Sequence, residues 1–127
     1  MQDFIYGIDI SNLLKARDVF ERFRRHLESD QEKAGAIQAF EFCYELIWKT
    51  MKRVLEKKGI EVRSPRDCFR EAGLNKLISD PEQWFIFLEK RNLSSHTYKE
   101  ENVDAIVHIF PQFSAAMSEF IQQLYQL

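Results

Sequence analysis

Residues 31–58 read QEKAGAIQAFEFCYELIWKTMKRVLEKK and decide the fold class. Their apolar side chains recur three or four positions apart, which is the period of an amphipathic helix with one buried face. The predicted buried stripe consists of Ile37, Phe40, Glu41, Tyr44, Trp48, Met51 and Leu55. Gly59 follows at the position where many helices end in a left-handed glycine. The segment therefore predicts one long helix whose apolar face other helices must cover.

The segments on either side show the same helical period and clear helix-start signals. Ser64-Pro65 and Asp80-Pro81 each place a capping side chain directly before a proline, as in the first turn of many helices. Pro111 falls inside the last apolar pattern and predicts a kink there. Besides the helix over 31–58, we expect helices over about residues 11–28, 65–73, 81–91 and 101–125.

Three long helices and a medium one, joined by short connections, predict an all-α protein. The expected architecture is an up-and-down four-helix bundle with one extra short helix. No segment alternates polar and apolar residues with a period of two, so we expect no strand. At 127 residues with 45% hydrophobic side chains, the chain is the size of one domain, and we assign residues 1–127 to it.

The composition limits the classes of protein to which the chain can belong. Its apolar runs are only a few residues long, which predicts no membrane span and a cytoplasmic protein. Cys43 and Cys68 both lie in apolar helical patterns, so we expect reduced thiols that pack as small apolar side chains. The chain has no glycine-rich phosphate loop and no metal-binding motif, and His26 and His108 have no partner nearby in sequence. We therefore expect neither a metal nor a cofactor.

The charge is small overall but unevenly distributed. The formal net charge of −2 argues against a protein that coats nucleic acid generally, because such binding depends on neutralising phosphates. Residues 49–70 contain eight basic and three acidic side chains, a local charge of +5. Residues 99–127 contain one Lys and four acidic side chains, a local charge of −3. Two interpretations stay open: solvated helix faces, or a surface that attracts RNA or an acidic partner.

The segment RNLSSHTY, residues 91–98, is the candidate site. The Arg91 guanidinium can bind phosphate oxygens bidentately, and the His96 imidazole can transfer protons near neutral pH. Together they could attack a phosphodiester, with His96 as base or acid and Arg91 stabilising the developing negative charge. The alternative that the residues leave open is structural: Arg91 pairs with an acid and His96 caps a helix end.

Helix geometry limits how this pair could work. On a continuous helix Arg91 and His96 would point about 140° apart, while Arg91 and Tyr98 would share a face. Either the helix ends at Ser94-Ser95 and lets His96 turn back, or a second subunit completes the site.

These residues also carry a resemblance to a known family. Arg91-x4-His96-x-Tyr98 resembles the Arg-x4-6-His motif of HEPN domains, in the form found in HEPN–MNT toxin–antitoxin pairs. Nearly the whole chain is similar to the nucleotidyltransferase substrate-binding protein branch of that superfamily. The residues of that wider pattern are Phe40-Glu41-Phe42, Glu45-Leu46-Ile47-Trp48-Lys49, Gly59, Ser64-Pro65, Glu71-Ala72, Leu77-Ile78, Trp84, Arg91-Asn92 and His96-Thr97-Tyr98.

The resemblance implies a homodimer with two Arg/His motifs at a shared cleft and a minimal nucleotidyltransferase partner encoded nearby. It implies that Arg91 contacts the scissile phosphate of an RNA and that His96 acts on the 2′-hydroxyl without a metal. Asn92 would be an auxiliary polar residue. Tyr98 matches the tyrosine that, in some such pairs, the nucleotidyltransferase modifies with AMP to silence the toxin, because a bulky anion repels RNA phosphates.

Glu41 is a further candidate, because a carboxylate inside an apolar helical stripe needs a partner. We expect it to pair with Arg91 or a nearby lysine and to orient the motif; the alternative is that the stripe reaches solvent there.

Three functions then stay open. The chain could be a toxin-type metal-independent endoribonuclease, or a non-catalytic binding subunit that presents a substrate to the nucleotidyltransferase. The third is a helical adaptor for which Arg91 and His96 are dispensable.

Overall fold

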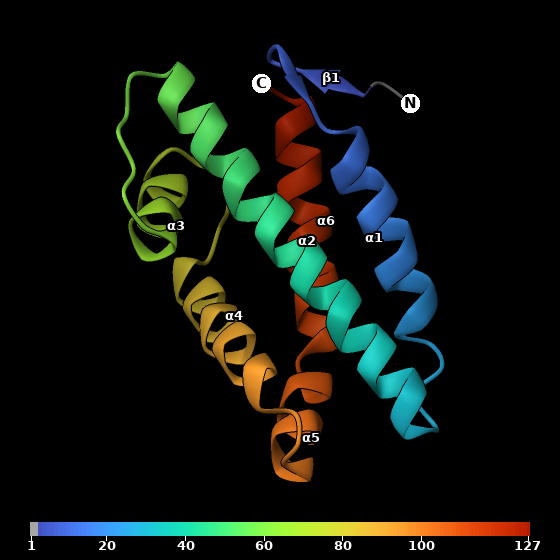
Figure 1. Ribbon diagram of the computed structural model, residues 1–127. Coiled ribbons are helices and arrows are strands. Elements are labelled where there is room, and N and C mark those ends of the chain that lie inside the picture. Colours follow the sequence, from blue (N-terminus) through green and yellow to red (C-terminus); the bar gives the residue numbers. More distant parts are fainter. Residues whose placement is uncertain (1–2) are drawn as a thin grey trace.

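Helix α2, Asp30–Lys57, is the longest element, and the other helices pack around it (Figure 1). The structure is a computed structural model that describes residues 3–127. The remaining elements are β1 (Phe4–Ile5), β2 (Ile8–Asp9), α1 (Ser11–Phe23), α3 (Pro65–Leu74), α4 (Pro81–Leu93), the 3-10 helix η1 (Ser94–His96), α5 (Glu100–His108) and α6 (Phe110–Tyr125).

The predicted all-α bundle with one extra short helix is confirmed. In Figure 1, α1 runs alongside α2, α6 lies behind them, and α4 runs on the side of α2 opposite α1, with α3 near the start of α4. α1, α2, α4 and the α5–α6 pair are the four members of the bundle, and α3 is the extra short helix.

Local capping explains where α2 begins and ends. Ser29 and Glu32 form a reciprocal capping box: the Ser29 Oγ accepts the Glu32 N–H at 3.0 Å, and the Glu32 Oε1 accepts the Ser29 N–H at 2.9 Å. The hydrogen bond that the Glu32 carboxylate accepts from the Ser29 N–H lowers its pKa. At the other end Gly59 has a φ of +82°, and the Ile60 N–H reaches back to the Leu55 carbonyl at 2.9 Å. The expected left-handed glycine is therefore present, in a Schellman arrangement.

Two predicted helices differ in extent from what the sequence suggested. α1 ends at Phe23 rather than near residue 28, because the next residues form the turn into the capping box of α2. The kinked helix expected over 101–125 is two separate helices that meet at Ile109. Pro111 lies in the first turn of α6, where its missing N–H is harmless, whereas a continuous helix would have clashed with its ring.

The expectation of no strand was wrong for a short hairpin before α1. β1 and β2 pair antiparallel, with Ile5 opposite Ile8. The two turn residues, Tyr6 and Gly7, have φ values of +57° and +76°, as a type I′ turn requires. Strands of two residues are too short to show a period, so the sequence pattern could not reveal them.

An aromatic cluster fixes the helices around the candidate site. The Phe113 ring of α6 lies 5.3 Å from Phe20 of α1, 4.8 Å from Phe40 of α2 and 5.1 Å from Phe87 of α4, measured between ring centroids. All three contacts are edge-to-face, the favourable geometry for such pairs. One ring therefore joins four helices, including the two that carry the residues described below.

Both cysteines are buried free thiols, as predicted. Burial raises the pKa of Cys43 and of Cys68 to about 12. Among residues 3–127, no helix is both long and apolar enough to cross a membrane.

Candidate functional site

The segment 91–98 spans the end of α4 and the turn that follows it. α4 ends at Leu93, and Ser94–His96 form the 3-10 helix η1. The helix thus ends at Ser94-Ser95, as the first of the two alternatives expected, but among the described residues His96 forms no hydrogen bond with Arg91. Arg91 lies on the last turn of α4 and is largely shielded from solvent, whereas His96 and Tyr98 are exposed.

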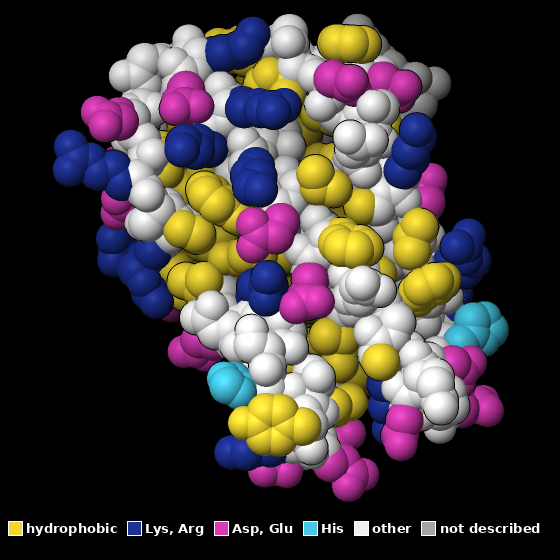
Figure 2. All heavy atoms as spheres, viewed as in Figure 1, with side chains coloured by type: hydrophobic (Ala, Val, Ile, Leu, Met, Phe, Trp, Pro, Cys, Tyr) yellow, Lys and Arg dark blue, Asp and Glu magenta, His cyan; other side chains and the backbone are white. Residues whose placement is uncertain are grey.

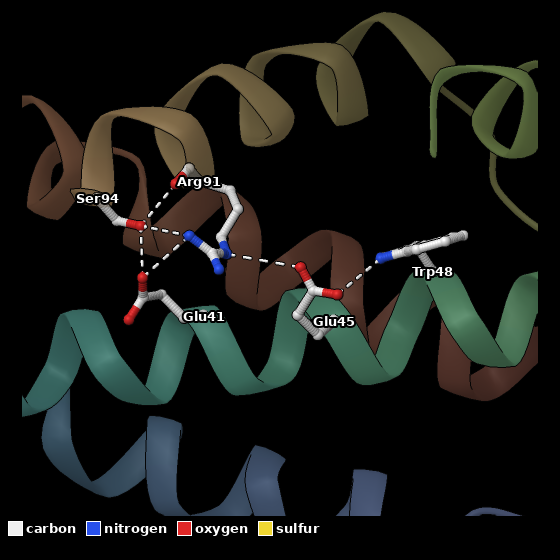
Figure 3. A network of polar contacts seen from close by, with 5 residues as sticks. All are labelled: Glu41, Glu45, Trp48, Arg91 and Ser94. Carbon is white, nitrogen blue, oxygen red and sulfur yellow. Dashed lines mark hydrogen bonds and ion pairs between the residues drawn. The ribbon is translucent and has the colours of Figure 1, made fainter. Parts of the chain in front are cut away.

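Arg91 points from α4 toward α2 and is held there by two carboxylates (Figure 3). Its Nη1 lies 3.1 Å from Glu41 Oε2 and 2.9 Å from Ser94 Oγ. Its Nε lies 3.6 Å from Glu45 Oε1, an ion-pair distance slightly too long for a hydrogen bond. The predicted pairing of Glu41 with Arg91 is therefore confirmed. Two carboxylates face one guanidinium, so the cluster is net negative.

Ser94 connects the two helices at this point. Its Oγ lies 2.6 Å from Glu41 Oε2 and 2.6 Å from the Arg91 carbonyl oxygen, while it accepts a hydrogen bond from Arg91. A hydroxyl has one hydrogen, so it donates to one of these oxygens at a time, and the carboxylate is the stronger acceptor. Ser94 is buried, which protects these bonds from competition with water. It therefore fixes Arg91 and Glu41 relative to each other.

The network continues along α2 beyond the predicted residues. The Trp48 indole N–H donates to Glu45 Oε2 at 3.0 Å, so Glu45 joins Trp48 to Arg91 (Figure 3). Glu45 and Ser94 were not predicted as site residues. Glu45 is one helical turn beyond Glu41 and Ser94 is three positions beyond Arg91, so helical spacing was the available signal.

His96 and Tyr98 form a second, exposed part of the site. His96 Nδ1 lies 3.2 Å from the Tyr98 hydroxyl, and the two rings meet edge-to-face with centroids 5.7 Å apart. The Asn102 side chain donates to the His96 carbonyl at 3.0 Å and thereby ties η1 to α5. Tyr98 is 77% exposed, so its hydroxyl is accessible to another molecule. Asn92, predicted as an auxiliary residue, is exposed, and its side chain forms no polar contact with the described residues.

Within one chain the two parts remain separate. In the described part of the chain no hydrogen bond joins Arg91 to His96: Arg91 bonds to Glu41 and Ser94, while His96 faces Tyr98. On a continuous helix Arg91 and Tyr98 would share one face. They do not share a face here, because α4 ends at Leu93. Arg91 Nη2 and His96 Nε2 have no hydrogen-bond partner among residues 3–127.

An open pocket of about 600 Å³ lies between the first half of α2 and the η1–α5 segment. Glu41, Ser94 and Tyr98 line one side of it. Its other ionisable lining residues are Asp30, Lys33, Glu100 and Asp104. Four carboxylates and one lysine make the pocket acidic, so it disfavours phosphate groups.

A buried tyrosine lies beneath the Arg91 network. The Tyr44 hydroxyl has no hydrogen-bond partner in the described structure. Burial raises its pKa, the Glu45 carboxylate raises it further, and the Arg91 cation acts in the opposite direction. Tyr44 is therefore a neutral phenol at physiological pH. Among residues 3–127, no group of three or more His, Cys, Asp or Glu side chains is arranged to hold a metal ion.

Comparisons with known proteins identify the family and the fold of the chain. A family model described as nucleotidyltransferase substrate binding protein like matches residues 9–126. A Haemophilus influenzae protein named "Probable ribonuclease HepT" is 39% identical over an alignment of 98 residues, and the match covers 73% of this chain and 67% of that protein.

Two solved structures share the fold over most of their length. One, from Haemophilus influenzae, is described as revealing the fold of a substrate binding domain of a nucleotidyltransferase. It is 31% identical, with a TM-score of 0.82, and the match covers 92% of this chain and 99% of that one. The other, from Thermus thermophilus, is 30% identical, with a TM-score of 0.81, and the match covers 88% of this chain and 98% of that one.

Proposed function

Because this chain belongs to the nucleotidyltransferase substrate-binding protein family, a branch of the HEPN-like superfamily, we propose that it is a toxin-type endoribonuclease. Its activity would be controlled by a minimal nucleotidyltransferase encoded nearby. The observation that carries the proposal is the pair of free nitrogens, Arg91 Nη2 and His96 Nε2, at the same end of α4. The relative named as a probable ribonuclease supports the same activity.

The proposed chemistry uses these two nitrogens on one RNA linkage. His96 Nε2 takes the proton of a ribose 2′-hydroxyl, and the O2′ attacks the adjacent phosphorus. The bond from phosphorus to the 5′ oxygen breaks, and His96 returns the proton to that oxygen, leaving a 2′,3′-cyclic phosphate. Arg91 Nη2 stabilises the negative charge on the phosphoryl oxygens. The Tyr98 hydroxyl holds the imidazole through Nδ1, so that Nε2 faces the substrate.

We propose that the site is completed in a homodimer. Arg91 and His96 share no hydrogen bond within one chain, so twofold pairing of two motifs at one cleft would bring a cation and a base to the same phosphate. Residues 1–127 would act as one domain, which the Phe113 contacts with three other helices support. We place the protein in the cytoplasm, together with its RNA substrate.

Tyr98 is the proposed point of control. Its hydroxyl is exposed and lies 3.2 Å from His96 Nδ1. Transfer of AMP from ATP to this oxygen, with release of pyrophosphate and of the hydroxyl proton, would replace the hydroxyl that holds the imidazole and would add a negative charge beside it. Both changes oppose cleavage of a polyanion. Asn92 is exposed next to Arg91 in sequence and is proposed as an auxiliary contact to RNA.

The second candidate function is a non-catalytic subunit that presents a substrate to the nucleotidyltransferase. This candidate is favoured by Glu41 and Glu45, because their carboxylates already pair with the Arg91 guanidinium. Expression of wild type, Arg91→Ala and His96→Ala separates the candidates. Growth arrest and RNA cleavage that persist in EDTA and disappear in both variants support the nuclease. If purified wild type leaves RNA intact while forming a complex with the nucleotidyltransferase, the binding subunit is correct.

The neighbouring reading frame tests the partnership itself. A small nucleotidyltransferase with a Gly-Ser and Asp-x-Asp signature is expected there. Light scattering of the purified chain tests the dimer, and a monomer at all working concentrations would contradict the shared cleft.

A further inference from the structure

The second half of α2 and the start of α3 carry a group of cations without carboxylate partners. In Figure 2, Lys and Arg side chains gather over the upper part of α2 and along the edge formed by α3, with hydrophobic side chains between them. Among residues 3–127, the cations of residues 49–70 that form no ion pair are Lys49, Lys52, Arg53, Lys57, Lys58 and Arg66. The local charge of +5 is therefore carried mainly by cations that no carboxylate pairs with.

Part of this charge is held against an aromatic ring. The Arg66 guanidinium carbon lies 4.8 Å from the centroid of the Phe85 ring, and that of Arg70 lies 5.7 Å from it. The Phe85 ring is half-buried and is anchored by Phe69, whose ring centroid is 6.4 Å away. Arginines held in this way present flat, charged surfaces with little loss of side-chain freedom on binding. Such surfaces stack on nucleobases and bind phosphates at the same time.

These cations lie close to the Arg91 network. The Cys68 thiol of α3 donates to the Trp48 carbonyl of α2 at 3.5 Å, which places the start of α3 beside this part of α2. Lys49 and Lys52 follow Glu45 by four and seven positions, so the three side chains share one face of α2. Trp48 and Glu45 extend from Arg91 along the same helix. We define the basic face as Lys49, Lys52, Arg66, Arg70 and Phe85, of which Arg70 also pairs with Asp67 at 3.4 Å; it adjoins the candidate site.

We propose that the basic face binds a single-stranded RNA segment that flanks the linkage at Arg91 and His96. This inference rests on the proposed ribonuclease function and names the surface that holds its substrate. The cations bind phosphates, and the arginines stacked on Phe85 receive a base. A single strand is favoured over a duplex because only unpaired bases expose their faces for stacking. The pocket next to Tyr98 is acidic, so the strand extends over the basic face and away from that pocket.

Salt-dependent binding of a non-cleavable RNA tests the proposal. The probe is a fluorescent oligouridylate with 2′-O-methyl sugars, which has no free 2′-hydroxyl and cannot be cleaved. Its affinity for the full chain is measured by anisotropy at several salt concentrations. Lys52→Gln with Arg66→Gln removes two phosphate contacts and should lower the slope of log affinity against log salt by about 1.4. At 0.1 M salt this corresponds to binding on the order of twenty-fold weaker.

Two further variants distinguish local charge from overall charge and from misfolding. Lys15→Gln with Arg25→Gln removes the same net charge from exposed positions in and just after α1 and should leave the slope unchanged. Lys52→Arg with Arg66→Lys keeps both charges and should keep the wild-type slope. An equal loss in both glutamine pairs would overturn the proposal, because binding would then depend only on net charge.

The outcomes also separate this proposal from the ribonuclease function. If wild type cleaves RNA through Arg91 but the Lys52/Arg66 glutamine variant binds the probe normally, the basic face is not the RNA surface and the nuclease stands. If the basic face binds polyglutamate but not the RNA probe, its partner is an acidic protein and the proposal is wrong. If wild type neither binds nor cleaves RNA, both proposals fail.

Discussion

The ion pair between Glu41 and Arg91 makes a measurable prediction about stability. Glu41→Gln keeps the shape of the side chain and an oxygen that can accept from Ser94 and Arg91, but it removes the charge. At 3.1 Å, two unit charges attract by about 5 kcal/mol for an effective dielectric constant of about 20. Desolvation and side-chain ordering cancel most of this. Because both side chains are less than a third exposed, we expect a net coupling of about 1–2 kcal/mol.

A double-mutant cycle measures this coupling directly. Glu41→Gln, Arg91→Met and the double variant are unfolded in urea, and the coupling is the part of their free-energy changes that does not add. For a chain of 127 residues, 1 kcal/mol corresponds to about 4 °C in Tm, so the single Glu41→Gln change is also visible by thermal unfolding. Cleavage activity should fall in the same variant, because Arg91 loses an orienting partner.

Glu45 and Glu89 supply the internal controls for this cycle. Glu45 is 38% exposed and lies 3.6 Å from Arg91, so its coupling to Arg91 should be about 0.5 kcal/mol or less. Glu89 is exposed on the same helix as Arg91 and forms no ion pair among the described residues, so Glu89→Gln should leave the free energy of unfolding unchanged. A Glu41 coupling no larger than the Glu45 coupling would refute the inference that Glu41 is the principal partner. Unchanged activity in Glu41→Gln would refute its orienting role.

Three other predictions concern the scaffold. Ser29→Ala removes half of the capping box of α2 and should lower the free energy of unfolding by about 1 kcal/mol, measured in urea. Gly59→Ala should destabilise by about 1 kcal/mol and Gly59→Asn by less, because the φ of +82° is strained for alanine even though no atom lies within 4 Å of the new Cβ. Burial raises the pKa of Cys43 and Cys68 from 9.0 to about 12. Burial of the two neutral thiols therefore contributes fully to the free energy of unfolding below pH 9, and this contribution is lost as the pH rises toward 12, because the thiols of the unfolded chain ionise first. Urea midpoints should therefore decline above pH 9, and a thiol reagent at neutral pH should react only with unfolded chains; rapid labelling of the native protein would contradict this.

The helices could be predicted because their signals are local. Ser64, Asp80 and Gly59 act on the backbone within a few residues, so the helix ends that they mark agree with the structure to within about two residues. The separation of α5 from α6 was harder to predict, because Pro111 indicates that the helix is interrupted but not the direction in which the chain continues. The β1–β2 hairpin depends on two turn residues with positive φ, Tyr6 and Gly7. A search for periodic apolar residues does not detect such a turn.

The candidate site was predictable only in part, for a related reason. Glu41 could be inferred from the energetic penalty of an unpaired carboxylate in an apolar stripe. Glu45 and Trp48 gain their roles from the way α4 crosses α2, which depends on packing throughout the core. The relation between Arg91 and His96 depends on the turn at η1 and, in our proposal, on a second copy of the chain.

The break at Ile109 means that the two motif residues are anchored very differently. Arg91 is bonded to α2, which the aromatic core holds on several sides. His96 and Tyr98 lie on a short segment that continues into α5, where Ile106 is the buried residue. A molecule that grips α5 could therefore shift the base relative to the cation while the bundle stays intact, because short, lightly buried segments move at low energetic cost. Residues 91–98 thus contain one side chain that is fixed to the core, Arg91, and two, His96 and Tyr98, on a segment that can move relative to it.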